Sequence, residues 1–524
     1  MKRMTRAALA LAATLSLGQA LGVTRGGQMV FGRAADSLFL DPVLNDANLD
    51  IWILTNLYDT LLQPTPDGKR VQPGLASRYV VSKDGMTMTL TLRPGIKFAD
   101  GSPITSADVK WNLDRARNPD NGIWGYLIES IASVAASGNT VTITLKHPDP
   151  VLPSALAAFN TAIMPQKLFD AAPGKNDAEK AKAFAEHPIG SGPFVLSEWK
   201  RGSYMVLKRN PYYWKMGEDK KALPYLDTLR FEILPDDNTR ILKLQAGEIQ
   251  GAEFIPLSRA PELRADPKLN MVLFPSTQVN SIFMNNRPKL KNGTANPLSD
   301  VRVRQALNYA VNRPALIQLV TFGAGKPMTS FMSSSTPLFD KSLKGFPYDP
   351  AKAKALLTAA GYANGMDVSI ITTSGNATSQ ALTTTLQQMW GAVGVRLKIE
   401  QLDAASNTAR YRANDFQMRA SGWTDDLADP SEITSYFAVA GTTEAAHTGF
   451  SDPTIEKLFV QSQQEINKAK RAAQYKQIQT IYNNASPIIY LYETPYPVAL
   501  AKFVKGFNQI PLGNNIFEAT WLDK

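Results

Sequence analysis

Cysteine is absent from all 524 residues of the chain. This absence excludes disulfide bonds, thiol catalysis and thiolate metal sites. Histidine is nearly as scarce, because only His147, His187 and His447 are present. None of the three has a second histidine or a paired acid at the spacing of metal ligands. The sequence therefore predicts no metal site and no cofactor.

Long apolar runs and blocks of one charge are also missing beyond the N-terminus. Crossing a bilayer takes about 20 consecutive apolar residues, and no later segment provides such a run. The formal net charge is +10 at neutral pH, yet no run of five like charges occurs. Because nucleic acids are bound by clustered basic residues, a dispersed surplus argues against a nucleic-acid partner.

The N-terminus has the composition of a secretory signal peptide. The opening MKRMTR is basic, and the apolar stretch 7–17 is too short to span a bilayer. Small residues follow, so we predict a signal peptide at 1–20 and a mature chain from Leu21. Loss of its three basic residues lowers the formal charge from +10 to +7. Without a cysteine that could carry lipid, the exported chain is expected to be a free periplasmic protein and not a lipoprotein.

The length of the chain and its periodicity predict a mixed α/β protein of several domains. A chain of 524 residues exceeds what one hydrophobic core usually supports, which predicts two or three domains. Met88, Leu90 and Leu92 alternate with threonines, as in a half-buried strand. Helix signals alternate with such strands: Thr105 and Asp108 form a capping-box pattern, and Asp300 and Asp349 stand where helix N-caps belong.

Several longer segments resemble, in order, the signature of the extracellular solute-binding proteins of peptide-type ABC importers. This family includes oligopeptide, dipeptide and nickel binders. Each match alone is weak, but together they span nearly the whole mature chain. The segments include LASRYVVSKDGMTMTLTLRPGIKFADGSPITSADVKWNL, GSGPFVLSEWKRGSYMVLKRNPYYW, LQAGEIQGAEF, DVRVRQALNYAVNR, YDPAKAKALLTAAGY, SGWTDDLADP and FSDPTIEKL.

The resemblance implies a periplasmic-binding-protein-like clamp with two lobes, an additional domain and mixed sheets. Lobe I would be discontinuous, assembled from 24–62, 189–277 and 498–524. The additional domain would occupy 63–188, and lobe II would occupy 278–497. Such proteins close like a Venus flytrap around a ligand, and a membrane permease reads the closed form. The expected partners are a peptide ligand and an ABC transporter permease, and the chain is expected to be a monomer.

The segment SGWTDDLADP carries the main candidate site. In the family's peptide binders, the aspartate three residues after the tryptophan holds the α-ammonium group of the ligand, which implies this role for Asp426. Inside a clamp that excludes water, an unpaired carboxylate is costly, and an arriving ammonium relieves that cost. The alternative is that Asp426 is an exposed or purely structural acid. Asp425 is a weaker candidate, and Asp429, which precedes Pro430, is expected to be a cap.

The neighbours of Asp426 match further ligand contacts of the family. Trp423 could cover an apolar side chain or an ammonium by cation–π contact, or it could simply be a core aromatic. Gly422 and Thr424 match positions that offer backbone hydrogen bonds to an extended peptide, a mode that ignores side-chain identity. Other matches to pocket-facing segments of the family are Asp46, Asn48, Trp124 and Tyr492.

One feature departs from the dipeptide binders of the family. Their arginine, which fixes the ligand carboxylate, lies on the helix before the W-x-x-x-G-V stretch. Here that stretch is WGAVGV, and SGNATSQALTTTLQQM before it contains no basic residue. Arg410, Arg412 and Arg419 lie nearby and could substitute, or they could be solvated. Strict specificity for free dipeptides is therefore not predicted, and longer peptides or another cationic solute remain open.

The sequence lacks the complete motifs of the enzyme classes that short matches suggest. SEWK satisfies S-x-x-K, but the partner motifs KTG and SDN are missing, and FGAGKP lacks the first half of a phosphate loop. We predict a non-catalytic, periplasmic substrate-binding protein that captures peptides and delivers them to an ABC permease. The alternatives are the same role for a nickel chelate, a sugar or another cationic solute, and an exported peptidase or amide hydrolase. Incubation with a peptide library would reveal cleavage if the last were correct.

Overall fold

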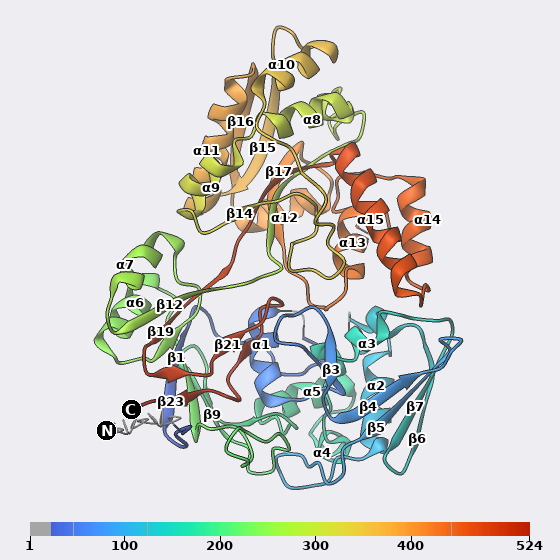
Figure 1. Cartoon of the computed structure of the whole chain (residues 1–524), viewed down its shortest axis with the longest axis vertical. Coiled ribbons are helices and arrows are strands. Elements are labelled where there is room, and N and C mark those ends of the chain that lie inside the picture. Colours follow the sequence, from blue (N-terminus) through green and yellow to red (C-terminus); the bar gives the residue numbers. More distant parts are fainter. Residues whose placement is uncertain (1–21, 46, 123, 442) are drawn as a thin grey trace, which may run out of the picture.

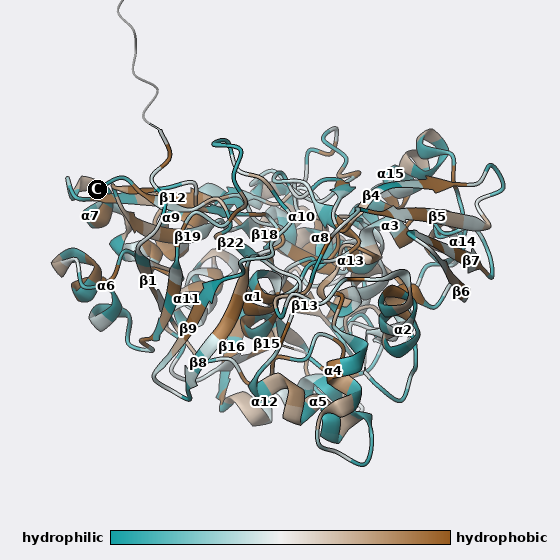
Figure 2. Cartoon of the chain, turned by 90° about the horizontal axis from the view of Figure 1, so that it is seen from below, coloured by the Kyte–Doolittle hydropathy of each residue, from teal (hydrophilic) through white to brown (hydrophobic). Residues whose placement is uncertain are grey.

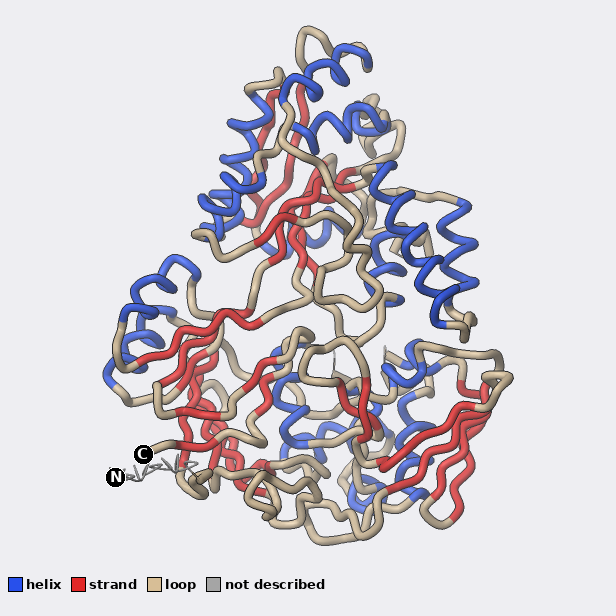
Figure 3. Tube along the Cα trace, viewed as in Figure 1, coloured by secondary structure: helices blue, strands red, loops and turns tan. Residues whose placement is uncertain are grey.

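The computed structural model describes residues 22–45, 47–122, 124–441 and 443–524. The predicted signal peptide lies outside these residues. Figure 1 shows two large α/β bodies, one above the other, and a smaller sheet at the side of the lower body. Figure 3 distinguishes the strands of these bodies, in red, from the flanking helices, in blue. The mixed α/β class predicted from the sequence is confirmed.

The largest sheet has seven strands in the order β12-β19-β11-β1-β10-β9-β8. β1 pairs in parallel with β10 and β11, while the other neighbours are antiparallel. Residues from the start, the middle and the end of the chain therefore meet in one sheet. Its strands are β1 (Gln28–Arg33), β8 (Phe194–Lys200), β9 (Tyr204–Arg209), β10 (Thr228–Ile233), β11 (Gly251–Ala252), β12 (Leu269–Phe274) and β19 (Tyr496–Ala501).

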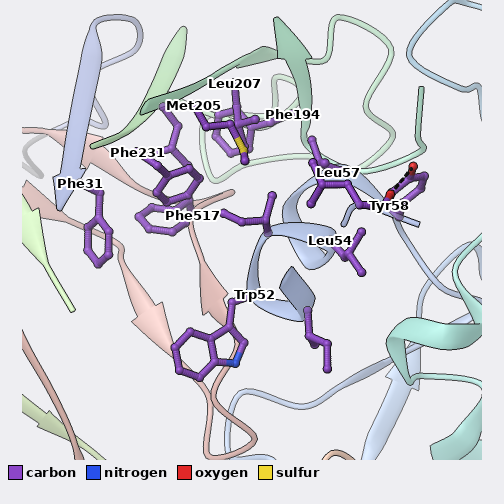
Figure 4. Close-up of a cluster of buried hydrophobic side chains, with 14 of the residues drawn as sticks. Phe31, Trp52, Leu54, Leu57, Tyr58, Phe194, Met205, Leu207, Phe231 and Phe517 are labelled. Atoms are coloured by element: carbon purple, nitrogen blue, oxygen red, sulfur yellow. Dashed lines mark hydrogen bonds between the residues drawn. The ribbon is translucent and has the colours of Figure 1, made fainter. Parts of the chain in front are cut away.

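The core of this lower body lies between the seven-stranded sheet and helix α1 (Asn48–Leu57). Figure 4 shows Phe31 and Phe231 from the sheet meeting Phe517, with α1 contributing Trp52 and Leu57. The three phenylalanine rings pack edge to face, with centroids 5.1 to 6.2 Å apart, an arrangement that aromatic quadrupoles favour. The remaining helices and strands of the lower body are α6 (Asp237–Ala246), α7 (Ala260–Ala265), β20 (Val504–Lys505), β21 (Asn508–Gln509), β22 (Asn515–Ile516) and β23 (Trp521–Leu522).

The upper body contains a six-stranded sheet with the order β14-β18-β13-β17-β15-β16. Its strands are β13 (Val279–Met284), β14 (Lys326–Pro327), β15 (Met366–Thr373), β16 (Val395–Leu402), β17 (Met418–Trp423) and β18 (Ile488–Glu493). Its helices are α8 (Val301–Tyr309), α9 (Arg313–Thr321), α10 (Pro350–Ala359), α11 (Ala377–Gly391), α12 (Ala404–Arg412), α13 (Ser431–Ala438), α14 (Pro453–Ser462) and α15 (Lys468–Ala485). The predicted caps are confirmed, because Asp300 and Asp349 accept backbone N–H groups at the starts of α8 and α10.

The third sheet is antiparallel, with the order β4-β5-β7-β6, so the hairpins β4–β5 and β6–β7 are joined through β5 and β7. Met88, Leu90 and Leu92 of β5 are buried, so the predicted alternation is confirmed. Thr105 and Asp108 form the predicted capping box at the start of α2. The helices and strands of this region are β2 (Leu62–Pro64), β3 (Val71–Pro73), β4 (Ala76–Val81), β5 (Thr87–Leu92), α2 (Ser106–Ala116), β6 (Ile131–Ser137), β7 (Thr140–Leu145), α3 (Leu152–Ala155), α4 (Gln166–Ala171) and α5 (Asp177–Glu186).

The chain crosses between the two large bodies twice, from β12 to β13 and from β18 to β19 (Figure 1). The crossings lie side by side, because the Thr494 hydroxyl donates to Gln278 Oε1 over 2.8 Å and Thr494 N donates to the Gln278 carbonyl over 3.3 Å. Thr277 N also donates to the Pro511 carbonyl over 2.9 Å. The domain boundaries proposed from the sequence, near these crossings, stay a prediction.

The upper body also touches the four-stranded sheet region directly. The loop between β17 and α13 inserts Leu427, which is 1% exposed, into the apolar cluster of that region. Beside it, the Ser154 hydroxyl donates to the Ala428 carbonyl over 3.2 Å. Ile466, in the turn between α14 and α15, lies against Gly85 of the β4–β5 turn. The four-stranded region therefore forms part of the surface on which the upper body rests.

Hydropathy follows this layered arrangement. Figure 2 shows hydrophobic colour along strands such as β15 and β16 and hydrophilic colour on many peripheral loops. Among the described residues, none of the helices combines the length and the apolar character that a membrane crossing demands.

Candidate functional site

Asp426 lies in the loop between β17 and α13, where the upper body meets the four-stranded region. The side chain is half-buried. Its backbone N–H donates to Glu432 Oε2 over 2.9 Å, and the N–H of Leu427 donates to the same oxygen over 3.2 Å. Burial raises the pKa of Asp426 to about 6, because a carboxylate loses hydration in this environment.

Glu432, in the first turn of α13, brings a second carboxyl group next to Asp426. Its side chain is only 5% exposed. Burial, followed by repulsion from the carboxyl groups of Asp426 and Asp425, raises the pKa of Glu432 well above its usual range. Two neighbouring carboxyl groups that have lost much of their hydration do not both ionise readily. The pair therefore favours a state that retains a proton until a cation arrives.

Asp425 supplies a third carboxyl group, which is fully buried. Thr336 Oγ1 donates to its Oδ2 over 2.7 Å, and Trp423 Nε1 donates to its Oδ1 over 3.0 Å. Burial nevertheless raises its pKa to about 7. These contacts fix the loop and the indole of Trp423, so Asp425 positions its neighbours.

Among the described residues, these three carboxyl groups have no basic partner. Across the described parts of the chain, no ion pair reaches Asp425, Asp426 or Glu432. Asp429 differs, because Arg471 binds it with two hydrogen bonds of 2.7 and 2.8 Å. Asp429 Oδ1 also accepts the N–H of Ser431 over 2.9 Å. The N-cap position of α13 is nevertheless held by Pro430, without a side-chain cap bond, so the predicted cap at Asp429 is wrong. A poorly hydrated acidic cluster without a counter-ion favours an incoming cation.

Trp423 and its neighbours on β17 form one wall beside the acids. The indole of Trp423 is half-buried and stacks on Tyr436, with ring centroids 4.3 Å apart. Gly422 is exposed and pairs with Asn280 of β13. A Cβ atom at Gly422 would lie 3.1 Å from the Val279 carbonyl, so the strand leaves little room for a side chain there.

Tyr496, at the crossing into β19, is a site residue that the sequence argument missed. It is 5% exposed, and its phenol lies close to Thr424 and to the carboxyl groups of Asp425 and Asp426. Burial is the main cause that raises its pKa. In the described chain its hydroxyl lacks a hydrogen-bond partner of ordinary geometry. A buried hydroxyl of this kind is available to a ligand.

An aromatic surface leads from Tyr496 into the lower body. Trp52 of α1 packs edge-on against Tyr496 with a centroid distance of 6.2 Å, and it stacks on Phe254 at 5.2 Å. Trp52 was not predicted as a site residue, because an aromatic inside an amphipathic helix is usually core. The site therefore has an acidic side in the upper body and an aromatic side in the lower body.

The remaining predicted residues lie in several different environments. Asp46 falls outside the described residues, and Asn48 is an exposed first residue of α1. Trp124 is half-buried, and its indole N–H donates to the Asn45 carbonyl over 2.8 Å. Tyr492 of β18 is 3% exposed within the core of the upper body, one strand away from Gly422. Their roles in ligand binding stay predictions.

Of the three arginines near β17 that could take a ligand carboxylate, Arg410 and Arg419 are engaged by other groups of the described chain. Arg410 pairs with Glu400 at 3.0 Å. Arg419 donates to Asn407 Oδ1 over 2.7 Å and lies over the ring of Tyr411. Arg412 is exposed on α12. The partner for a carboxylate is therefore unassigned.

Metal binding finds no support in the geometry. In the described ranges, histidine and acidic side chains form no group of three or more that could hold a metal ion. The His147 ring is hydrogen-bonded to the carbonyl of Pro148, and the His447 ring is hydrogen-bonded to Asn414.

Comparison with known proteins decides the family. The model of bacterial extracellular solute-binding proteins, family 5 Middle, matches residues 70–444. The chain belongs to this family. It is therefore a solute-binding protein of ABC importers, from a non-catalytic family whose members bind ligands and deliver them to membrane permeases. The S-x-x-K match accordingly lies within strand β8.

Individual relatives of this family 5 protein cover nearly its full length. The glutathione-binding protein GsiB of Salmonella typhimurium is 32% identical over 516 residues, which cover 96% of both chains. NikA from Brucella suis in complex with Fe(III)-EDTA superposes with a TM-score of 0.84 at 24% identity, covering 95% of this chain and all of that one. DppA from Helicobacter pylori with the peptide STSA gives 0.79 at 24% identity, covering 96% and 99%. These two structures show the shared fold.

Proposed function

We propose that this protein is a periplasmic, monomeric peptide-binding protein that captures its ligand between two lobes and delivers it to an ABC permease. The observation that carries this proposal is the acidic cluster of Asp425, Asp426 and Glu432, which has no basic partner in the described chain. A peptide brings an α-ammonium group, and Asp426 is its counter-ion. Similarity to a glutathione-binding protein supports a short peptide-like ligand, because glutathione is a tripeptide.

The remaining contacts suit a peptide main chain. Gly422 is exposed on β17, and Thr424, two residues further on, lies beside the phenol of Tyr496. Backbone groups in this position can pair with an extended ligand whatever its side chains are. Trp423 and Trp52 provide apolar surface on the two sides. Closure around the ligand would remove water from Asp426 and strengthen its attraction for an ammonium group.

A cationic solute that is not a peptide is the second candidate, because the same three carboxyl groups would attract it. A metal–polycarboxylate chelate, as bound by NikA, is disfavoured. Such a chelate carries negative charge, and the cluster offers no positive group to meet it in the described chain.

Replacing Asp426 by alanine tests the proposed anchor. Removal of one partner of a buried ion pair costs about 3–5 kcal/mol, or roughly two to three and a half decades in affinity. Asp426→Ala is therefore expected to weaken the binding of Ala-Ala-Ala at least tenfold in isothermal titration. The control is Asp367→Asn, at an exposed pair with Arg396 on another strand, which should leave affinity unchanged.

Two results would contradict the proposed function. Unchanged affinity of Asp426→Ala would remove Asp426 as the anchor. Failure of the natural protein to bind any member of a di- to pentapeptide library, while a non-peptide cation binds, would replace the peptide by that solute. Native mass spectrometry of the gently purified protein identifies the ligand that it carries from the cell.

A further inference from the structure

A cavity of about 220 Å³ lies between the four-stranded region and helices α13 and α14. Its volume is several times one water's share of the liquid, about 30 Å³, so it can admit a long side chain. Tyr126, Leu127, Glu129, Ser130, His147, Asp149 and Val151 line it from one side, and Ser431, Glu432, Ser435, Phe459 and Gln463 line it from the other.

The lining of this cavity is acidic. It contains the carboxyl groups of Glu129, Asp149 and Glu432 and no lysine or arginine among the described residues. The imidazole of His147 also lines the cavity, and the nearby basic side chains Arg471 and Lys146 are engaged by other groups. Arg471 is bound to Asp429 by two hydrogen bonds, and the ammonium of Lys146 donates to the backbone carbonyl of Glu129.

Glu432 is the buried acid that faces this cavity without a counter-ion. It is 5% exposed and lines the cavity wall. Its Oε2 accepts the backbone N–H groups of Asp426 and Leu427. In the described chain no other hydrogen bond reaches its carboxyl group. A carboxyl group in this position leaves one oxygen available to a cationic ligand group.

The cavity is next to the proposed ammonium site. Tyr126 lines the cavity, and both Glu432 and Asp426 raise the pKa of its phenol, in addition to the effect of burial. The geometric link is the hydrogen bond of 2.9 Å from Asp426 N to Glu432 Oε2, which places Asp426 directly against an acid of the cavity wall. A peptide whose ammonium binds Asp426 would direct the side chain of its first residue toward Glu432.

Apolar groups in the same lining suit the stem of a long basic side chain. Leu127, Val151 and Phe459 line the cavity together with the acids. Lysine and arginine bury their methylene stems on apolar surface and place the charged head on polar groups. A short or anionic side chain would leave the carboxyl group of Glu432 without a counter-ion.

We propose that this cavity is a subsite for a basic side chain on the first residue of the peptide, with Glu432 as its counter-ion. This inference rests on the proposed function and adds a side-chain preference to it. Two carboxyl groups, Asp426 and Glu432, then match two positive charges of one ligand residue, the α-ammonium and the guanidinium or ammonium of the side chain.

Titration with a matched pair of peptides tests this subsite. The probes are Arg-Ala-Ala and its citrulline analogue, which has nearly the same shape without the charge. The natural protein should bind Arg-Ala-Ala at least tenfold more tightly than the analogue. Glu432→Gln keeps an oxygen for the two backbone N–H groups, so it should reduce this ratio to about one while still binding the analogue. The control, Glu262→Gln at an exposed pair on α7, should preserve the ratio.

The position of the arginine in the peptide and the charge of its side chain distinguish the possible outcomes. Ala-Arg-Ala should bind more weakly than Arg-Ala-Ala, and equal binding would overturn the assignment to the first residue. Equal affinity of the natural protein for the arginine and citrulline peptides would overturn the subsite while leaving peptide capture intact. Absence of binding to every peptide would instead overturn the proposed function. If Glu432→Gln does not fold, the comparison on the natural protein still decides.

Discussion

Asp425, Asp426 and Glu432 lie within one short loop and the helix turn that follows it, and burial raises the pKa of each. A raised carboxyl pKa means that the folded protein binds a proton more tightly than the unfolded chain does. The stability that this proton provides is present below the unfolded pKa, about 3.9 for aspartate. It is lost as the pH rises through the folded pKa, which is about 6 for Asp426. The empty site is therefore less stable at neutral pH than in mild acid.

Asp426→Asn should show this effect in the ligand-free protein. Because the amide cannot ionise, the variant is expected to melt at a higher temperature than the natural protein at pH 7. The difference should shrink as the pH falls from about 6 to about 4. Differential scanning calorimetry across this range measures it. A variant that melts lower at pH 7 would show that the carboxylate is already stabilised by the fold.

At the scale of helices and loops, the Asp429–Arg471 pair joins the site loop to α15. Both side chains are buried, and Arg471 Nε also donates to the Ser462 carbonyl at the end of α14 over 3.0 Å. The loop that carries Asp426 is thus held by a helix more than forty residues further along the chain.

Arg471→Ala is expected to destabilise the upper body by about 3–5 kcal/mol, because it leaves the Asp429 carboxylate buried and unpaired. Urea unfolding followed by circular dichroism measures the loss. Arg396→Ala removes an exposed partner of Asp367 and should cost less than about 1 kcal/mol. Equal effects of the two substitutions would mean that Asp429 finds water or another donor.

Local elements could be predicted from the sequence because their signals are local. The capping box at Thr105 and the caps at Asp300 and Asp349 depend on residues within one helical turn. Family resemblance supplied Asp426. Glu432 was missed because an acid in the first turn of a helix is commonly present only for its favourable interaction with the helix dipole. Tyr496 was missed because its approach to Thr424 depends on a crossing seventy residues away.

At the scale of the whole molecule, the contact between the upper body and the four-stranded region closes the site from one side. Leu427 is inserted into the apolar cluster of that region, and the Ser154 hydroxyl bonds to the next residue's carbonyl. If the lobes open to admit the ligand, this contact breaks and must form again when they close. Side-chain burial there would then contribute to ligand affinity as well as to stability.

Leu427→Ala should therefore weaken peptide binding about tenfold or more, since it removes apolar contacts that hold the closed form. Small-angle scattering should show a larger radius of gyration at subsaturating peptide than for the natural protein. Leu242→Ala, at a largely exposed leucine of α6, serves as the control. Unchanged affinity and radius for Leu427→Ala would mean that this contact persists in the open form.

The adjacent crossings have one more consequence. Gln278 and Thr494 are hydrogen-bonded to each other, so the upper body begins and ends at the same place and is continuous in the gene between those two codons. Because the two junctions are adjacent in space, the upper body could be replaced by that of a relative without lengthening the chain at either junction. Chimeras joined there should inherit the acidic half of the pocket from one parent and the aromatic half from the other.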